Sequence, residues 1–126
     1  MLEVSRLSGH WVQVATFAPG GQAVCGPGAV EITENAARWD LCLADGRHRG
    51  TGALMPGKPG RFAVDGMADW WVLWADGDYR TLVIGTPSGA FGFVLNRDTA
   101  LPPDRKQAVG DIAGFNGYHV EELVVF

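Results

Sequence analysis

The side chains best suited to chemistry are few and scattered along the sequence. The three histidines, His10, His48 and His119, show neither the i, i+4 spacing nor the acidic partner motif that marks a zinc site. The sequence contains no nucleophile elbow, phosphate-binding loop or dinucleotide-binding glycine motif. Most Asp and Glu residues fall at turns and exposed strand positions, where carboxylates are usually just solvated. We therefore expect no catalytic constellation, no bound metal and no cofactor, and the chain is not predicted to be an enzyme.

The two cysteines, Cys25 and Cys42, allow one disulfide and exclude a four-thiolate metal site. A bridge between them would close a loop of ordinary length and contribute about 3 kcal/mol in the chain-entropy picture. Simple hairpin pairing does not place the two residues opposite each other, so a bridge requires the intervening loop to fold back. A disulfide and two free thiols are both consistent with the sequence.

Composition narrows the class of protein further. The 126 residues carry 10 Lys and Arg against 14 Asp and Glu, a net charge of −4, which argues against a nucleic-acid partner. Hydrophobic residues make up 47% of the chain and charged residues 19%, enough core material for one globular domain spanning residues 1–126. The longest apolar run, Trp70 to Ala75, is far shorter than the roughly 20 residues of a membrane span. The first residues lack an apolar stretch, so we expect no signal peptide within this sequence.

Short segments of alternating apolar and polar residues predict strands that are buried on one face. They are separated by turn signals such as Asp45-Gly46 and Asp76-Gly77. Eight strands at this even spacing, joined by short turns, favour an up-and-down antiparallel barrel, because closure removes the exposed sheet edges. The predicted strands cover residues 11–17, 29–33, 38–43, 48–54, 61–65, 70–74, 80–84 and 91–95.

The C-terminal part of the sequence has a different pattern. Leu101-Pro102-Pro103-Asp104 predicts the start of a helix, since proline is tolerated in the first turn. An apolar face of this helix is predicted from Ala108, Val109, Ile112 and Phe115. One such helix cannot form a core alone, so it should pack outside the barrel, and residues 120–126 predict a final short strand.

Three motifs resemble those of lipocalins. Gly9-His10-Trp11 resembles the Gly-x-Trp motif of the first strand, and Gly77-Asp78-Tyr79-Arg80 resembles the second motif, with Gly77 in the threonine position. Asn96-Arg97-Asp98, followed by a helix that starts at prolines, resembles the third. Their order and spacing match from about Leu7 to the end, and bacterial outer-membrane lipocalins are the most similar group. The chain resembles a shortened member, since only Gly66–Asp69 join the fifth and sixth strands.

The resemblance implies a barrel that is plugged at one end and open at the other. Gly9, Trp11, Asp78, Tyr79 and Arg97 would then form the closed end, with Arg97 lying across the indole of Trp11 as a structural lid.

Alternation along each strand assigns side chains to the interior once Trp11 and Arg97 are placed inside. In the first strand this puts Gln13, Ala15 and Phe17 inward, and in the sixth strand it puts Trp71 and Leu73 outward. The result is an apolar and strongly aromatic lumen, the usual site for a small hydrophobic ligand. The predicted ligand-binding residues are Trp39, Leu41, Phe62, Val64, Trp70, Val72, Trp74, Val83, Phe91 and Phe93.

The open rim should carry the first loop, the third turn and the loops at 66–69 and 86–90. Arg47 and Arg49 fall in the third turn, with His48 between them. Positive groups at the mouth of an apolar cup suit a carboxylate or phosphate head group, so these two arginines are candidate head-group contacts.

The leading hypothesis is a carrier of a fatty acid, lysophospholipid or similar hydrophobic molecule. The resemblance to bacterial lipocalins implies a periplasmic or outer-membrane-associated setting, with peripheral membrane attachment through a lipidated segment that this sequence does not contain. The main alternative is a small barrel filled by its own tryptophans. Such a barrel would act as a structural or protein-interaction module, dimerising through a patch of Trp71, Leu73 and the Leu123–Phe126 end. A small enzyme that uses the cup is the third reading.

Overall fold

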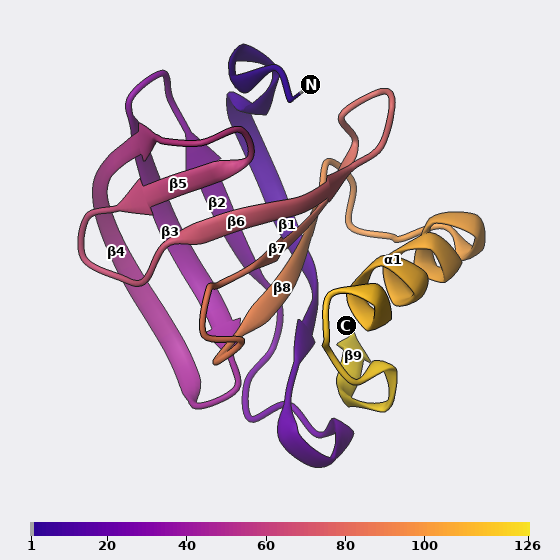
Figure 1. The fold of residues 1–126 in the computed structure, drawn as a ribbon. Helices are drawn as coiled ribbons and strands as arrows, with labels where there is room; N and C mark the ends of the chain where they lie inside the picture. Colours follow the sequence, from indigo (N-terminus) through magenta and orange to yellow (C-terminus); the bar gives the residue numbers. More distant parts are fainter. Residues whose placement is uncertain (1) are drawn as a thin grey trace.

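The computed structural model describes residues 2–126, and these residues form a closed antiparallel barrel of eight strands (Figure 1). Each strand from β2 to β7 pairs with the next strand in the sequence, and β1 pairs with both β8 and β2 to close the barrel. This confirms the predicted fold class. The strands are β1 (Gly9–Phe17), β2 (Gly28–Ile32), β3 (Ala36–Leu43), β4 (Gly46–Pro56), β5 (Arg61–Val64), β6 (Trp70–Ala75), β7 (Thr81–Gly85) and β8 (Gly92–Asn96).

A single α-helix, α1 (Pro103–Phe115), lies outside the barrel beside β6 and β7 (Figure 1). Val109 and Ala113 are its buried residues, one turn apart on the face toward the wall. The prediction that Phe115 belongs to this face is wrong, because Phe115 is 93% exposed. Six residues separate it from Val109, which turns it about 240° around the axis and away from the barrel. None of the described helices is long and apolar enough to span a membrane.

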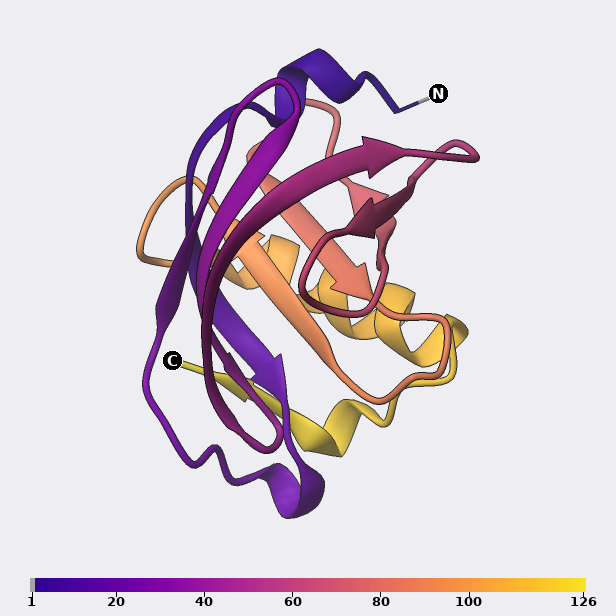
Figure 2. The same ribbon diagram turned by 90° about the vertical axis from the view of Figure 1, so that its left-hand side faces the viewer.

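Short 3-10 turns and a ninth strand complete the described chain. The turn η1 (Val4–Leu7) precedes β1, and η2 (Pro19–Gly21) lies in the long loop after it. The turn η3 (Val120–Glu122) leads into β9 (Leu123–Val125), which is shorter than the predicted final strand. Figure 2 shows this C-terminal segment and the first loop meeting at the same end of the barrel, where Ala18 N–H donates to the carbonyl of Glu122 at 2.9 Å.

β1 carries two partners on one edge. Residues Gly9 to Gln13 pair with β2, and residues Ala15 to Phe17 pair with β9, while β8 occupies the opposite edge. Since β2 begins only at Gly28, the backbone of Cys42 on β3 has no β2 partner. The buried amide of Gln13 takes this place: its Oε1 accepts from Cys42 N–H at 2.7 Å, and its Nε2 donates to Cys42 O at 2.6 Å.

Two breaks in register change which side chains face inward. One lies between Gln13 and Ala15 of β1, and the other between Val72 and Trp74 of β6. Each irregularity shifts the alternation by one residue. Ala15 and Trp74 consequently lie in the layer under α1, and Phe17 packs against Tyr118 with ring centroids 4.9 Å apart.

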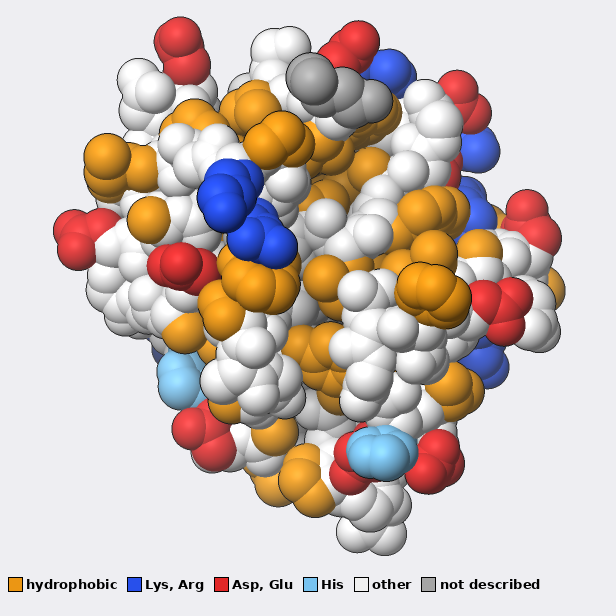
Figure 3. Space-filling model, viewed as in Figure 1, with side chains coloured by type: hydrophobic (Ala, Val, Ile, Leu, Met, Phe, Trp, Pro, Cys, Tyr) orange, Lys and Arg blue, Asp and Glu red, His pale blue; other side chains and the backbone are white. Residues whose placement is uncertain are grey.

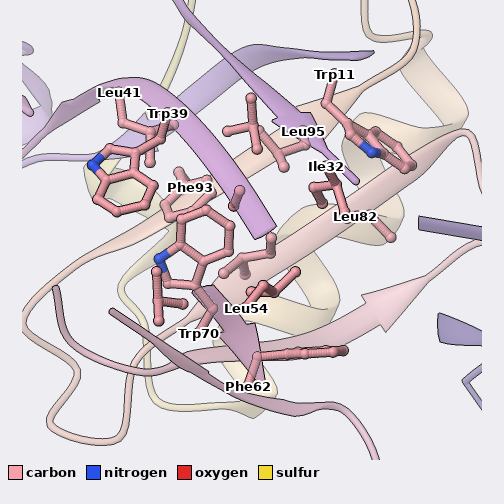
Figure 4. Packing of buried hydrophobic residues seen from close by; sticks show 14 of the residues in the cluster. Trp11, Ile32, Trp39, Leu41, Leu54, Phe62, Trp70, Leu82, Phe93 and Leu95 are labelled. Atoms are coloured by element: carbon pink, nitrogen blue, oxygen red, sulfur yellow. The ribbon is translucent and has the colours of Figure 1, made fainter. Parts of the chain in front are cut away.

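The predictions that Ala15, Phe17 and Trp74 face the interior are therefore wrong. So is the interior position of Val83, which pairs with Trp74 and lies in the same outer layer. The outer layer contains Val12, Val14, Ala15, Leu73, Trp74, Val83, Val94, Leu101, Val109 and Leu123. The main core fills the barrel itself, where Leu82, Ile84, Phe93 and Leu95 join the aromatic side chains shown in Figure 4.

Candidate functional site: the barrel mouth and its aromatic floor

The closed end of the barrel is formed by Trp11 and Arg97. Trp11 is fully buried, and its Nε1 donates to the carbonyl of Leu7 in η1 at 2.7 Å. The Arg97 guanidinium lies over the indole, with Cζ 3.6 Å from the ring centroid. Its nitrogens also donate to the carbonyls of Arg6, Ser8 and His10 at 3.0 to 3.1 Å. The resulting lid joins η1, β1 and the end of β8.

Glycine is required at position 9 by two features of this lid. Its φ is +112°, a region that residues with a Cβ rarely adopt. A Cβ on Gly9 would also lie 3.0 Å from Nη1 of Arg97. The Gly-x-Trp motif thus leaves room for the guanidinium that covers the tryptophan.

The second motif contributes to the same end through Tyr79 and not through Asp78. The Tyr79 hydroxyl accepts from Glu3 N–H at 2.7 Å, and the guanidinium of Arg6 lies 4.2 Å from its ring centroid. Asp78 is exposed, and its Oδ2 lies 3.4 Å from Nη2 of Arg80. The turn is organised instead by Asp76, whose Oδ1 accepts from the N–H groups of Arg80 and Thr81 at 2.6 and 2.8 Å.

The charge state of Asp76 follows from these contacts. Partial burial raises the pKa of Asp76, but the hydrogen bonds from Thr81 and Arg80 and the nearby charges of Arg80 and Arg105 outweigh it, so the pKa is lowered overall. Arg105 of α1 donates to Thr81 Oγ1 at 3.0 Å, and Thr81 donates to Asn96 at 2.7 Å. The first turn of the helix is thereby fixed to the ends of β7 and β8.

At the opposite end of the barrel, a hollow of about 410 Å³ opens between three connections. These are the β3–β4 turn, the β5–β6 loop and the β7–β8 loop, as the sequence predicted for the open rim. Apolar side chains predominate, and the polar ones are Asp45 and His48, whose Oδ1 and Nε2 are 2.6 Å apart. That hydrogen bond lowers the pKa of Asp45. The hollow is lined by Leu43, Ala44, Asp45, His48, Gly66, Met67, Ala68, Ala90 and Phe91.

The floor beneath the mouth is a cluster of aromatic rings. Trp39 and Trp70 meet edge to face with centroids 6.0 Å apart, and Trp70 meets Phe93 in the same way at 5.6 Å (Figure 4). Phe91 stacks on Phe93 at 6.1 Å and connects this cluster to the rim. Met67 covers the floor from above, because Trp70 Nε1 donates to its Sδ at 3.2 Å.

Gly50 and Gly66 leave the space that the Trp39 indole occupies. A Cβ on Gly50 would lie 2.5 Å from Cζ2 of Trp39, closer than real contacts allow, and one on Gly66 would lie 3.6 Å away. Since Gly66 lines the hollow, the edge of this indole lies directly below the mouth.

Arg47 and Arg49 do not reach the hollow. Arg47 lies on the outer wall, where it donates to the carbonyls of Gly26 and Pro27 at 3.0 and 3.2 Å. Both arginines also pair with Asp40, at N–O distances of 3.2 and 3.3 Å. Alternation along β4 explains why neither arginine reaches the hollow, because His48 takes the inward position between them.

Cys25 and Cys42 form a disulfide, with Cα atoms 5.7 Å apart, which decides between the two readings of the sequence. Together with Arg47 it holds the loop after β1 against the outer wall. None of the residues lining the mouth hollow comes from that loop, so the mouth is left uncovered by it.

Three other hollows are somewhat larger than the mouth. The smallest of the three, of about 440 Å³, lies outside the barrel between α1 and the segment of η3 and β9. The two larger ones lie elsewhere on the molecule. One, of about 510 Å³, is a trough on the outer wall. Outward-facing side chains line it, among them the His10–Glu31 and Arg49–Asp40 pairs. The other, of about 480 Å³, lies beneath the N-terminal segment between η1 and β5, where Figure 3 shows hydrophobic side chains in a recess. The trough includes Trp39 among its lining residues but lies on the outer wall, and the recess borders none of the floor rings. The mouth opens at the end of the barrel itself, so it is the better candidate site. Residues 2–126 contain no cluster of three or more His, Cys, Asp or Glu side chains placed to hold a metal ion.

Most of the predicted lining residues lie in the barrel interior. Trp39, Leu41, Phe62, Val64, Trp70 and Phe93 are buried in the main core, and Val72 and Phe91 pack against it. Trp74 and Val83 are the two placed outside. The sequence predicts that Gln13 faces inward and that Asp76 lies in a turn, but it does not predict the contacts that Gln13, Met67 and Asp76 form. An Asp before a Gly-Asp-Tyr turn is nevertheless a common capping signal.

The profile of a family described as a lipocalin-like domain matches residues 57–126, more than half of the chain. The chain belongs to the lipocalin family. No curated protein matches its sequence. Lipocalins generally bind and transport small hydrophobic ligands and are not generally enzymes.

Solved lipocalin structures share the fold at low sequence identity. A siderocalin, Ex-FABP, described as acting through dual ligand specificities, is 15% identical with a TM-score of 0.71, covering 97% of this chain and 94% of its own. Apocrustacyanin A1 from lobster is 15% identical with a TM-score of 0.63, covering 95% of this chain and 76% of its own. The cockroach allergen Per a 4 is 12% identical with a TM-score of 0.68, covering 98% and 87%. These likenesses concern the fold.

Proposed function

We propose that this lipocalin binds a small hydrophobic molecule at the mouth of its barrel. The observation that supports the proposal is the hollow of about 410 Å³ that lies over the Trp39–Trp70–Phe93 floor. Apolar surface transferred from water to such a site gains about 25 cal/mol per Å², so even a modest ligand gains several kcal/mol. The opposite end is closed by Arg97, which leaves the mouth as the accessible end of the core.

A fatty acid or a lysophospholipid is the ligand class that the sequence favours. Its acyl chain would lie along Leu43, Met67 and Phe91, and its head group would lie near His48. Met67 is the residue best able to yield, because its thioether side chain is flexible and only partly buried against the core, where it accepts a hydrogen bond from Trp70 Nε1. Displacing it would deepen the hollow toward the two indoles.

The test is a titration with laurate and with a short-chain lysophosphatidylcholine, followed by intrinsic tryptophan fluorescence. Trp39 and Trp70 lie below the hollow, so occupancy should change the emission saturably. Phe91→Ser should weaken binding at least tenfold, whereas Phe115→Ser, an equally large change at a residue that is 93% exposed on α1, should leave it unchanged. A folded wild-type protein with no saturable response to either ligand would refute the proposal.

One observation favours a second function. The edge-to-face packing of Trp39, Trp70 and Phe93 fills much of the interior, as expected of a barrel that serves as an interaction module. The patch predicted for this role changes, because Leu73 lies under α1 and Trp71 is covered by the Arg61 guanidinium at 4.2 Å. The exposed Phe115, Val120 and Phe126 would carry a homodimer contact instead. Sedimentation at increasing protein concentration, with Phe115→Ser as the disrupting variant, tests this alternative.

We also propose the periplasmic or outer-membrane-associated setting that the family resemblance implies, with membrane attachment through a segment outside this sequence. The Cys25–Cys42 disulfide supports an oxidising compartment, where such bonds persist. Trapping free thiols with a maleimide reagent at the moment of cell lysis tests this: fully alkylated cysteines before any reduction would contradict the proposal.

A further inference from the structure

The hydroxyl of Thr86 is a buried polar group without a hydrogen-bond partner among the described residues. Thr86 is 6% exposed, and a buried hydroxyl that gives up its water contacts without replacement destabilises the fold. The nearest polar side chain is already engaged elsewhere: Tyr118 OH donates to the carbonyl of Phe91 at 2.6 Å and accepts from Thr86 N–H at 3.3 Å. The Thr86 carbonyl accepts from Gly89 N–H at 3.0 Å. Only the side-chain oxygen is left unpaired.

The position of Thr86 relates this group to the mouth. Along β7, Leu82 and Ile84 face the barrel interior, and Val83 faces the layer under α1. Alternation therefore places the Thr86 side chain on the inner side, at the start of the loop whose Ala90 and Phe91 line the mouth hollow. The unpaired hydroxyl lies below this rim and not on the outer wall.

A second donor lies at the same end of the core. The indole of Trp39 lies between Gly50 and Gly66. Its Nε1 is 3.1 Å from the position that a Cβ on Gly50 would occupy. Gly50 and His48 belong to the row of β4 residues that faces inward. This N–H forms no bond to another described residue, in contrast to those of Trp11 and Trp70. The aromatic floor therefore contains one N–H group without a hydrogen-bond partner among the described residues.

We propose that the mouth selects a compact, ring-shaped apolar molecule with a hydroxyl or carbonyl group that hydrogen-bonds to Thr86. This inference rests on the proposed binding of a small hydrophobic molecule at the mouth, and it favours ring-shaped ligands over long acyl chains. A flat ring stacks on Phe91 and Trp39, and the interlocked rings beneath limit how far a long chain can enter. A polar group on the ring satisfies the Thr86 hydroxyl, and a hydrocarbon of the same size leaves it unpaired.

The experiment compares 2-naphthol with 2-methylnaphthalene, which differ by a hydroxyl in place of a methyl group, and measures both affinities by equilibrium dialysis. We expect Thr86→Val to weaken 2-naphthol binding about tenfold, the loss of one net hydrogen bond of about 1.4 kcal/mol, and to leave 2-methylnaphthalene unchanged or tighter. Thr86→Ser should keep the preference for 2-naphthol. Thr51→Val, the same change on the exposed outer wall, should alter neither affinity.

Stability gives an independent readout. Because Thr86 Oγ1 has no hydrogen-bond partner within residues 2–126, Thr86→Val should leave Tm unchanged or raise it. A clear fall in Tm would mean that the hydroxyl supports the fold, which would overturn the inference. Equal losses for both probes in Thr86→Val would also overturn it while leaving the proposed function intact. Failure of the wild type to bind either probe or the acyl ligands would refute the proposed function itself.

Discussion

The two ends of this barrel differ in whether their polar groups are hydrogen-bonded. At the closed end, the Arg97 guanidinium donates to three carbonyls, and Trp11 Nε1, Tyr79 OH and Asp76 Oδ1 are each hydrogen-bonded to backbone. At the mouth, Thr86 Oγ1 has no partner among the described residues, and the rim is largely apolar.

This contrast predicts that the closed end determines the stability of the fold and that the mouth determines ligand affinity. Paired groups fix the closed end in one arrangement, and substitutions there should cost folding free energy. At the mouth, Gly50 and Gly66 leave room for the Trp39 indole, and the disulfide holds the loop after β1 away from the hollow. Substitutions there should therefore act mainly on ligand affinity. The following experiments test this division.

Trp11→Ala should show the largest effect. The side chain is fully buried beneath Arg97, and its removal leaves a cavity and an uncovered guanidinium, for a loss of about 3–5 kcal/mol in the free energy of unfolding. Urea denaturation measures the loss. Trp71→Ala, which removes an indole packed under Arg61 on the outer face, is the control and should cost about 1 kcal/mol. Similar losses for the two variants would contradict the special role of the closed end.

Replacing both Cys25 and Cys42 with Ala should cost about 3 kcal/mol, because the unfolded chain is freed from a loop closed over a separation of 17 residues. The loop does not line the mouth, so the affinity for the naphthalene probes should change less than twofold. Denaturation of the wild type with and without reductant should give the same difference. A large loss of affinity without loss of stability would show that the loop belongs to the site.

The closed end and the strand order could be predicted from the sequence because both depend on local patterns. Gly9-x-Trp11 and Arg97 have fixed positions relative to their strands, and alternation with short turns indicates a closed meander. The interior positions of Trp39, Trp70 and Phe93 followed from the same alternation.

The wrong predictions come from structural features that the alternation of apolar and polar residues does not report. The register breaks after Gln13 and Val72 carry no glycine or proline to mark them, yet each inverts the residues that follow. They place Ala15, Phe17 and Trp74 outward, together with Val83, the partner of Trp74. Arg47 and Arg49 were assigned to the rim as a cluster, although alternation allows only His48 to face inward. The unpaired Thr86 hydroxyl depends on what surrounds it in three dimensions, and no sequence pattern reports that.

Gly50→Ala tests whether the shape of the mouth depends on this glycine. The new Cβ would lie 2.5 Å from Cζ2 of Trp39, so the indole must move, at a cost of about 1–3 kcal/mol. Intrinsic fluorescence and probe affinity should change together with the free energy of unfolding. Gly77→Ala, where a Cβ meets nothing within 4 Å, should change none of them. If Gly50→Ala changed none of these three quantities, Trp39 would not be held against β4.

Asp76→Asn should produce the smallest effect, one that depends on pH. The pKa of Asp76 is lowered from its ordinary value of 3.8, so its carboxylate stabilises the fold at pH values above that range, and this contribution is lost as the pH falls through the lowered pKa. At pH 7, Asp76→Asn should cost about 1 kcal/mol, because one oxygen accepts from Arg80 and Thr81. Below the lowered pKa of Asp76 the variant and the wild type should become equally stable. Asp78→Asn, at an exposed carboxylate two residues away, should follow the wild type at every pH. If Asp78→Asn instead reproduced the pH-dependent loss, the second motif would organise the closed end through Asp78, and the role assigned to Asp76 would be wrong.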